Sequence, residues 1–496
     1  MASYVPATSA ERQEMLAALG LASEDELFAQ IPPEARAAAL DLPAGMSELE
    51  VAAELESLAA RDTVFASCFR GAGAYRHYVP AVVRSVTSKE EFVTAYTPYQ
   101  AEISQGVLQS IFEYQTQVCE LFGMDVANAS VYDGATAAAE GVLMCEERRR
   151  SGVVLAGAVD PQVAAVVRTY CRSRGVAVHE IAAGSDLAAD PGELAELLAT
   201  TGAASVLVQS PNYCGVIEDV DGIVAAAHAT GAKAVVSANP ISLGFLRTPG
   251  ECGADVAVAE GQPLGLPMSF GGPYLGIMCC TKKLMRRLPG RIVGQTTDAH
   301  GNRCFVLTLQ AREQHIRREK ASSNICSNEA LCAMTASVYL AAMGPRGLRR
   351  AAEGSAANAH YLAARLAELG FVQVSRRAFF HEFLTGVPAG VDAHALMDAL
   401  AGYGILGGLP VEGPDGPGIL WCCTELNRRA QVDALVSALG EILDTNAAAG
   451  DPSATGGPNA ACGPGATCGP AAPAAAPART AKTNAALAAA REASAL

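Results

Sequence analysis

The stretch that decides the fold runs from Ser205 to Ala238. It reads SVLVQ (Ser205–Gln209), then VDGIVAAAHAT (Val220–Thr230), then AVVSA (Ala234–Ala238). The two outer runs are short, apolar and rich in valine, which is typical of buried strands, and the middle run has the length of a helix. A strand, a helix and a second strand in this order form the unit from which parallel sheets are built.

The same pattern continues on both sides of this segment. Strands are predicted at Val153–Ala158, Val176–Ile181, Val256–Ala259 and Tyr274–Cys279, and helices at Pro161–Arg174 and, before them, Ala101–Gly123. In the last of these, apolar residues recur at helical spacing up to Gly123, a natural residue after a helix end. The sequence therefore predicts an α/β fold with a predominantly parallel sheet covered on both faces.

Composition divides the chain into four parts. Residues 1–60 carry two helix starts of the Ser-x-x-Glu type, Ser23 with Glu26 and Ser47 with Glu50, and are expected to form a helical arm. Residues 61–330 would form the large α/β domain and residues 331–445 a smaller one. Residues 446–496 include 21 alanines but no isoleucine, valine or aromatic residue, so we expect this tail to be disordered.

Charge and cysteine usage exclude several classes of protein. The 496 residues carry 36 Lys plus Arg and 51 Asp plus Glu, a net charge of −15, which argues against nucleic acid as a partner. No apolar run is long enough for a membrane helix and no secretory signal precedes the first helix, so a reduced, cytoplasmic protein is expected. The 15 cysteines show no Cys-x-x-Cys spacing, so no metal site is predicted.

One short region is unusually rich in tyrosine. Tyr75, Tyr78, Tyr96 and Tyr99 lie close together in sequence and are joined by His77. Gly71 and Gly73 precede them and permit a close approach of the backbone, so this region is built like a loop that contacts a ligand. The alternative is a tyrosine-rich loop that only fills an interface between domains or subunits.

Two glycine-containing segments are further candidates. In Asp133–Ala137, Gly134 and Thr136 open a predicted helix that continues to Arg150, where converging N–H and O–H donors suit a phosphate. Asp133 is equally an ordinary helix cap. The segment Gly261–Pro273, with Gly271 and Gly272, follows a predicted strand, and sheets of this kind bind ligands beyond the carboxyl ends of their strands.

Several long segments together resemble one family. They are FRGAGAYRHYVP (Phe69–Pro80), TPYQAEISQG (Thr97–Gly106), FEYQT (Phe112–Thr116) and VLTLQAREQHIRREKA (Val306–Ala321), besides the two glycine-containing segments. The chain from about residue 1 to 445 resembles the alpha subunit (subunit 1) of the glycine cleavage system P-protein, the decarboxylating glycine dehydrogenase. The resemblance implies a pyridoxal-phosphate-dependent transferase-like fold (fold type I).

In that family, pyridoxal phosphate serves to decarboxylate glycine, and the aminomethyl group passes to the lipoyl arm of the H-protein. Such chemistry needs a lysine to hold the cofactor and an acid beside its pyridine nitrogen. No lysine lies between Asn239 and Thr281, and the likely acid position holds the neutral Asn239. This chain alone should therefore have no catalytic residues for a pyridoxal enzyme.

The resemblance implies a partner that supplies what is missing. The family's beta subunit (subunit 2) brings the lysine and holds the cofactor covalently, while the alpha subunit completes the pocket across their interface. Tyr75, His77, Tyr78, Tyr96 and Tyr99 are then the predicted contacts, and the named glycines shape the backbone. The alternatives are a purely architectural or regulatory subunit and an autonomous pyridoxal enzyme.

One departure from the family and one basic segment need a structural answer. Cys304 stands where a glycine is expected in the family, which would alter a turn if that position needs a positive φ. The basic run Arg312–Lys320 would either dock an acidic carrier protein or form a solvated helix face.

Overall fold

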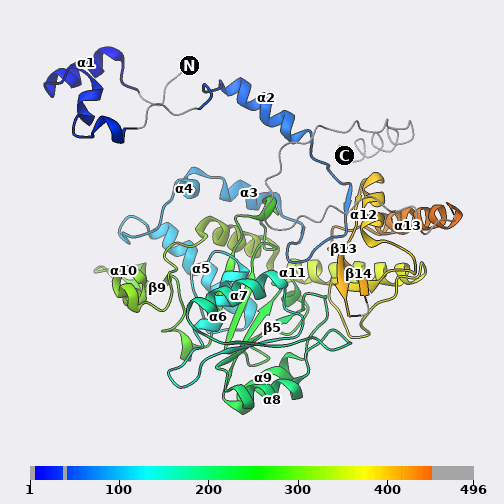
Figure 1. The fold of residues 1–496 in the computed structure, drawn as a ribbon. Coiled ribbons are helices and arrows are strands. Elements are labelled where there is room, and N and C mark those ends of the chain that lie inside the picture. Colours follow the sequence, from blue (N-terminus) through cyan, green and yellow to red (C-terminus); the bar gives the residue numbers. More distant parts are fainter. Residues whose placement is uncertain (1–5, 37–41, 415, 450–496) are drawn as a thin grey trace. The chain divides into compact units, whose positions relative to one another are not determined.

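Seven strands form the central sheet of the molecule, in the order β2-β8-β7-β6-β5-β3-β4. One of its inner strands, β5, is labelled in Figure 1. The computed structural model describes residues 6–36, 42–414 and 416–449. The strands are β2 (Val126–Ala127), β3 (Val153–Ala156), β4 (Val178–Ile181), β5 (Ser205–Ser210), β6 (Lys233–Ala238), β7 (Val256–Glu260) and β8 (Gly276–Cys280).

The pairing of these strands confirms the predicted sheet. β4, β3, β5, β6 and β7 run parallel, while β8 pairs antiparallel with β7 and with β2. The six strands expected from the valine-rich runs are all present, with their ends moved by one or two residues. The fold class predicted from the sequence is therefore correct.

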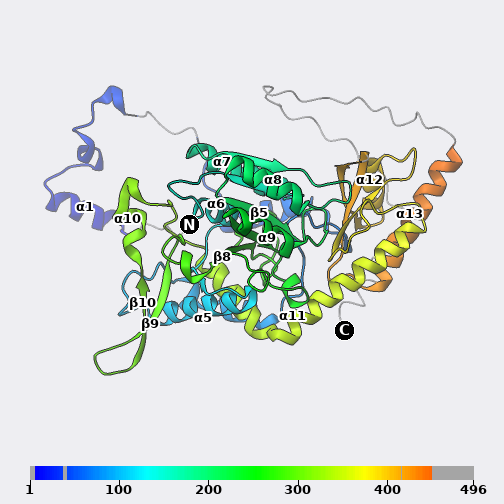
Figure 2. The same ribbon diagram turned by 90° about the horizontal axis from the view of Figure 1, so that it is seen from below.

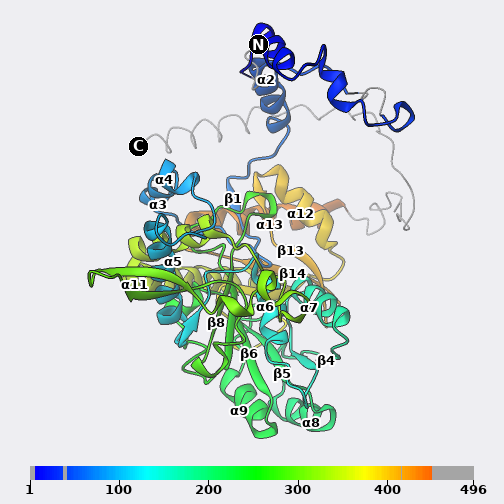
Figure 3. The same ribbon diagram turned by 90° about the vertical axis from the view of Figure 1, so that its left-hand side faces the viewer.

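Helices cover both faces of this sheet, as the buried residues show. Leu155 and Leu207 pack on the side of α6 (Gly134–Leu143) and α7 (Pro161–Ser173). Val206 and its neighbours face α8 (Pro191–Thr201) and α9 (Val220–Thr230), which lie side by side in Figure 3. At the β8 end of the sheet, α5 (Gln105–Phe122) and the first half of α11 (Ala330–Ala367) supply the cover.

A smaller sheet follows along the chain. It consists of β11 (Glu382–Gly386), β14 (Gly416–Cys422) and β13 (Leu409–Gly413), all antiparallel, and it packs with α12 (Ala393–Gly402) and α13 (Arg429–Ala449) around the buried Trp421. A short parallel pair joins β1 (Ser67–Cys68) to β12 (Ile405–Leu406). The long helix α11 bends at Gly344 and Pro345 and reaches this second core, as Figure 2 shows.

The N-terminal helices bear out one of the two predicted caps. α2 (Glu48–Ala59) begins with a full capping box of Ser47 and Glu50, and α1 (Ser9–Ala18) has another that the sequence analysis did not single out, Thr8 with Glu11. The prediction for Ser23 is wrong. Its side chain makes no cap, because a short 3₁₀ turn (Glu24–Phe28) forms there and Glu26 accepts from Ala22 N–H instead.

Two further local expectations need correction or an answer. The helix predicted to reach Arg150 ends at Leu143, and Arg150 instead donates to the carbonyl oxygen of Ala203. Cys304 lies inside strand β10 (Arg303–Thr308), opposite β9 (Ile292–Thr297), so no positive φ is needed there. The positive φ of this hairpin belongs to Gly301.

The remaining short helices are α3 (Ala81–Thr87), α4 (Glu90–Val93) and α10 (Gln314–Arg317). The basic run around α10 is not one helix face, because Leu309 and Arg318 have positive φ and divide it into single turns. Among the described residues, no helix has the length and apolarity needed to cross a bilayer. The chain divides into compact units only between residues 445 and 446, and the domain boundaries predicted at residues 60 and 330 stay predictions. The disorder predicted for the tail concerns mainly residues 450–496, which lie outside the described residues.

Candidate functional site

A cavity of about 400 Å³ opens where β5, β6 and β7 end and α6 begins. Sheets of this type bind ligands at this edge. The lining comes from the tyrosine-rich loop, the start of α6, the carboxyl ends of the strands and the start of β11; its polar members are Tyr75, Asp133, Asp160, Gln162, Gln209, Asn212, Ser237, Asn239, Glu260, Tyr274, His381 and Glu382. Four of these are carboxylic acids, and none is a lysine or an arginine.

Burial changes the acidity of this lining. It raises the pKa of Glu260 to about 7 and that of Glu382 to about 7, and it also raises the pKa of Asp160. Backbone N–H groups and the Tyr75 hydroxyl bond to the two glutamates and oppose this effect, without reversing it. Near neutral pH each of these glutamates is therefore poised between its two charge states.

The start of helix α6 is already engaged by the chain's own carboxylates. The N–H of Gly134 donates to Glu260 Oε2 (2.8 Å), and that of Thr136 donates to Asp133 Oδ1 (2.7 Å). The helix-cap interpretation of Asp133 is thus correct. Glu260 therefore already accepts from the Gly134 N–H, which a phosphate bound at this helix N-terminus would need as a donor.

Tyr75 joins the cavity to the smaller sheet. Its hydroxyl donates to Glu382 Oε2 (2.6 Å), and its backbone is bonded in both directions by the side chain of Gln262. Its ring centroid lies 4.6 Å from that of His381. Burial and the nearby His77 lower the pKa of His381 well below its usual value, so this imidazole is neutral.

His77 is held by a carboxylate on the far side of the same cluster. Its Nδ1 lies 2.7 Å from Glu425 Oε2, and the other oxygen of Glu425 accepts from Tyr78 N–H. Burial acts to raise the pKa of Glu425, but the hydrogen bond and the charge of His77 outweigh it and lower this pKa. The loop is therefore fastened at two points, by Tyr75 to the first residue of β11 and by His77 to the turn that follows β14.

The predicted site residues fall into two groups. Tyr75 and His77 belong to the cluster just described. Tyr96 and Tyr99, whose rings lie 6.2 Å apart, do not line the cavity, and Tyr78, Tyr96 and Tyr99 are exposed.

The glycines shape the backbone in different ways. A side chain on Gly71 would strike Glu382, so this position requires close approach. Gly73 and Gly271 line the cavity with φ near +106° and +108°, and Gly272 has φ +148°. Among the described residues, no group of three or more His, Cys, Asp or Glu is arranged to hold a metal ion.

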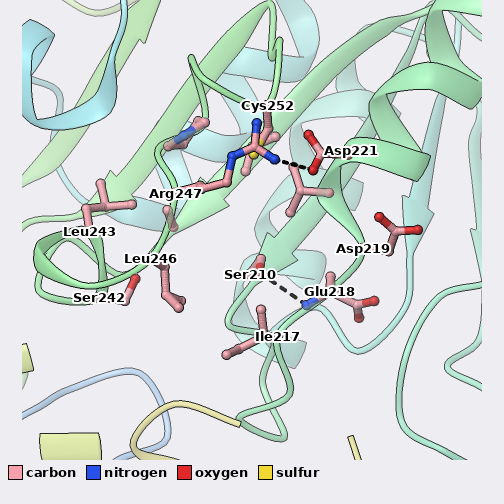
Figure 4. A pocket seen from close by; sticks show the side chains of 14 residues that line it. Ser210, Ile217, Glu218, Asp219, Asp221, Ser242, Leu243, Leu246, Arg247 and Cys252 are labelled. Carbon is pink, nitrogen blue, oxygen red and sulfur yellow. Dashed lines mark hydrogen bonds and ion pairs between the residues drawn. The ribbon is translucent and has the colours of Figure 1, made fainter. Parts of the chain in front are cut away.

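A second cavity of about 270 Å³ lies beside the N-terminus of α9 (Figure 4). Its walls are largely apolar, with Ile217, Leu243 and Leu246 among them. The polar groups are bonded to one another or to the backbone: Arg247 to Asp221, and Ser210 Oγ to the N–H of Glu218. Its polar groups are thus already engaged within the chain, so the acidic cavity is the better candidate for the functional site.

Comparison with known proteins identifies the family. The model of the glycine cleavage system P-protein matches residues 2–439. The chain belongs to this family. Two curated relatives, from Thermomicrobium roseum and Moorella thermoacetica, are both named probable glycine dehydrogenase (decarboxylating) subunit 1; each is 48% identical, and the matches cover 88% and 89% of this chain and 99% and 100% of the relatives.

Solved structures agree with the P-protein assignment. The chain is similar to a crystal structure of glycine decarboxylase (P-protein) in inhibitor-bound form, with a TM-score of 0.84 and 44% identity over 89% of this chain and 100% of the other. It also shares the fold of an alanine–glyoxylate aminotransferase from Nostoc sp., at a TM-score of 0.56 and 17% identity over 82% and 100% of the two chains. The fold is that of the pyridoxal-phosphate-dependent transferases, as predicted.

Several residues of the cavity escaped the sequence analysis. His381 and Glu382 are adjacent in sequence at the start of a strand, and Glu260 directly precedes the glycine-rich segment. The available signal was a charged residue at one terminus of a strand, the last residue of β7 for Glu260 and the first residue of β11 for Glu382. Gln262 lies within the candidate segment Gly261–Pro273 but was not singled out there, and no local signal pointed to Glu425.

Proposed function

We propose that this chain is the alpha subunit of a two-subunit P-protein and completes the active site of a lysine-bearing beta subunit. The assembled enzyme would decarboxylate glycine with pyridoxal phosphate and pass the aminomethyl group to the lipoyl arm of the H-protein. The proposal rests on family membership together with the chemistry of the acidic cavity.

The residues of this cavity do not fit pyridoxal phosphate. The cofactor needs a lysine for its aldehyde and donors for a doubly charged phosphate, whereas the lining has neither lysine nor arginine. Glu260 takes the Gly134 N–H, so a phosphate there would meet a carboxylate. Asn239 lines the cavity and is neutral, so it cannot stabilise a protonated pyridine nitrogen as a carboxylate would. The single observation that carries the proposal is this lack of cationic groups.

What the chain would contribute lies on its exposed loops. Tyr78, Tyr96 and Tyr99 are exposed, so their side chains are accessible to a partner's pocket. Tyr75 and His77 face inward, so we assign them the role of fixing the loop that carries Tyr78. Gly73, Gly271 and Gly272 give the neighbouring loops their shape. The exposed Arg317, Arg318 and Lys320 would suit an acidic carrier, which is where we place the H-protein.

The test is reconstitution. The isolated chain mixed with pyridoxal phosphate should give no lysine-linked absorbance band, and it should release no carbon dioxide from glycine. With a beta subunit both should appear. A band in the isolated chain, removed by borohydride and mapped to one of its own lysines, would instead show an autonomous enzyme.

Variants then separate an active-site contributor from an architectural subunit. The changes Tyr78→Phe, Tyr96→Phe and Tyr99→Phe remove hydroxyls that make no hydrogen bond within the described chain. At least one is expected to assemble normally and yet slow glycine decarboxylation roughly five- to a hundredfold. Unaltered kinetics in all three would favour the architectural role.

A further inference from the structure

Arg291 is a buried cation without a counter-ion. It lies between the end of β8 and the start of β9 and is 2% exposed. Its Nε, Nη1 and Nη2 make no hydrogen bond within the described residues, and no ion pair found there includes it. Five N–H donors are thus withdrawn from water with nothing to receive them.

The surrounding backbone holds this arginine firmly. The carbonyl oxygen of Arg291 accepts from Ala129 N–H (2.8 Å). Just before it, the carbonyl oxygen of Gly290 accepts from Arg312 Nη2 (2.6 Å). Just after it, the side chain of Gln115 bonds both the N–H and the C=O of Val293. The bond to Gly290 thus brings a second cation, Arg312, next to the backbone of Arg291.

Tyr99 covers the guanidinium. The Cζ atom of Arg291 lies 5.4 Å from the centroid of the Tyr99 ring, and Tyr99 is itself 59% exposed. A cation–π contact stabilises a cation by less than the burial of an unpaired charge costs. The ring therefore compensates the charge only in part, and it separates Arg291 from solvent by one exposed side chain.

We propose that Arg291 is an oxyanion-binding residue that receives a carboxylate or phosphate group when the ring of Tyr99 moves aside. Arginine presents paired N–H donors that match both oxyanions. The three unused nitrogens, a fixed backbone and an exposed cover are the features of a site prepared for such a group. Tyr99 then acts as the cover of an anion site.

This proposal deepens the proposed function, on which its biological role rests. In the assembled P-protein two small molecules carry the required group: glycine has a carboxylate, and pyridoxal phosphate has a phosphate. Because Tyr99 is exposed, the proposed function places it on the side from which both would approach. The experiments below distinguish the two sources.

The first experiment uses the full chain alone and needs no partner. Inorganic phosphate and formate are titrated by calorimetry at constant ionic strength into the wild type, Arg291→Met, Arg291→Lys and Arg303→Met. Arg303 is the matched control, because its guanidinium also lies over a ring, that of Phe305, but is exposed. We expect at least one anion to bind the wild type and the control equally, with a loss of about tenfold or more in Arg291→Met and a smaller loss in Arg291→Lys. Equal affinity in Arg291→Met, or no binding of either anion by the wild type, would overturn the proposal.

The second experiment uses the complex with the beta subunit. If the group is the phosphate, Arg291→Met raises the Kd for pyridoxal phosphate about tenfold and leaves the KM for glycine unchanged. If it is the carboxylate, the KM rises and the cofactor Kd stays the same. A folded, assembled variant with both constants unchanged contradicts a role for Arg291 in this site. Failure of every mixture to show activity would count against the proposed function, while the calorimetry would still decide the anion site.

Discussion

Glu260 and Glu382 are the residues whose chemistry departs furthest from that of an exposed side chain. Glu382 is buried and Glu260 is half-buried. Each accepts from a backbone N–H, and the lining of their cavity has no basic side chain except the neutral His381. Their pKa values of about 7 follow from burial in the first place. Between about pH 4.5 and pH 7 these two side chains are ionised in the unfolded chain but largely protonated in the folded chain, so folding in this pH range takes up protons.

The stability of the chain should consequently fall as the pH rises from about 4.5 to about 7. Below this window both states are protonated; within it the unfolded state releases protons that the folded state keeps, and above it the loss is complete. We expect Glu382→Gln to remove part of this slope, roughly 1–3 kcal/mol between pH 5 and pH 8. Urea unfolding at the two pH values measures it, with the exposed Glu196→Gln as the control. An unchanged slope in Glu382→Gln would contradict a protonated Glu382.

The tyrosine hydroxyls should divide into two kinds. Tyr75→Phe removes the O–H that bonds Glu382, so it should lower the free energy of unfolding by about 1–2 kcal/mol. Tyr96→Phe removes a hydroxyl from a side chain that is 78% exposed, so it should change stability by less than about 0.5 kcal/mol. Chemical denaturation of the isolated chain gives both values. Equal effects would mean that the Tyr75–Glu382 bond adds nothing to stability.

Among the helices, caps of the same sequence type have different outcomes. Ser47 and Glu50 close a reciprocal box at the start of α2, whereas Ser23 and Glu26 precede a single 3₁₀ turn without a cap. The difference arises because apolar residues at helical spacing follow Ser47, while the turn after Ser23 is soon followed by Pro32 and Pro33. A capping motif begins a helix only where the sequence beyond it sustains one.

Ser47→Ala should weaken α2 by about 1 kcal/mol, because the N–H of Glu50 loses the Ser47 hydroxyl that accepts its hydrogen bond. Hydrogen exchange of the amides of α2 should quicken about fivefold. Ser23→Ala serves as the paired control and should leave exchange in residues 24–28 unchanged. Faster exchange in both variants would show that the two serines act alike.

For the molecule as a whole, the apolar side chains that its own folding leaves exposed point to a partner. Phe270 is fully exposed and has a positive φ of 53°, which is costly for an aromatic residue. Tyr96, Tyr99 and Ile103 are exposed as well, and so is Leu49 of α2. A chain that buries a complete core yet keeps such residues outside fits the hetero-oligomer proposed above.

Phe270→Ser should therefore weaken assembly with the beta subunit about tenfold or more and leave the melting temperature of the isolated chain within about 1 °C. Analytical ultracentrifugation of mixtures measures the assembly. Val64→Ser changes an equally exposed apolar residue at a different place and is the control. If both substitutions weaken assembly to the same degree, the loss comes from placing a polar side chain on the surface in general, and Phe270 does not contact the partner specifically.

The sequence by itself determined the elements of this protein, since strands and helices follow from local periodicity. The valine-rich runs alternating with amphipathic stretches required a parallel sheet with helices on both faces, and Gly123 ended α5 where expected. It also indicated Tyr75 and His77, because glycines and polar rings crowd into one short loop. Only the tertiary structure decided what these residues meet: Glu382 and Glu425 approach from more than 300 positions away, Glu260 takes the helix amide, and Arg291 is buried without a counter-ion. Burial and long-range pairing depend on how whole elements pack, and the charge states of the cavity follow from that packing alone.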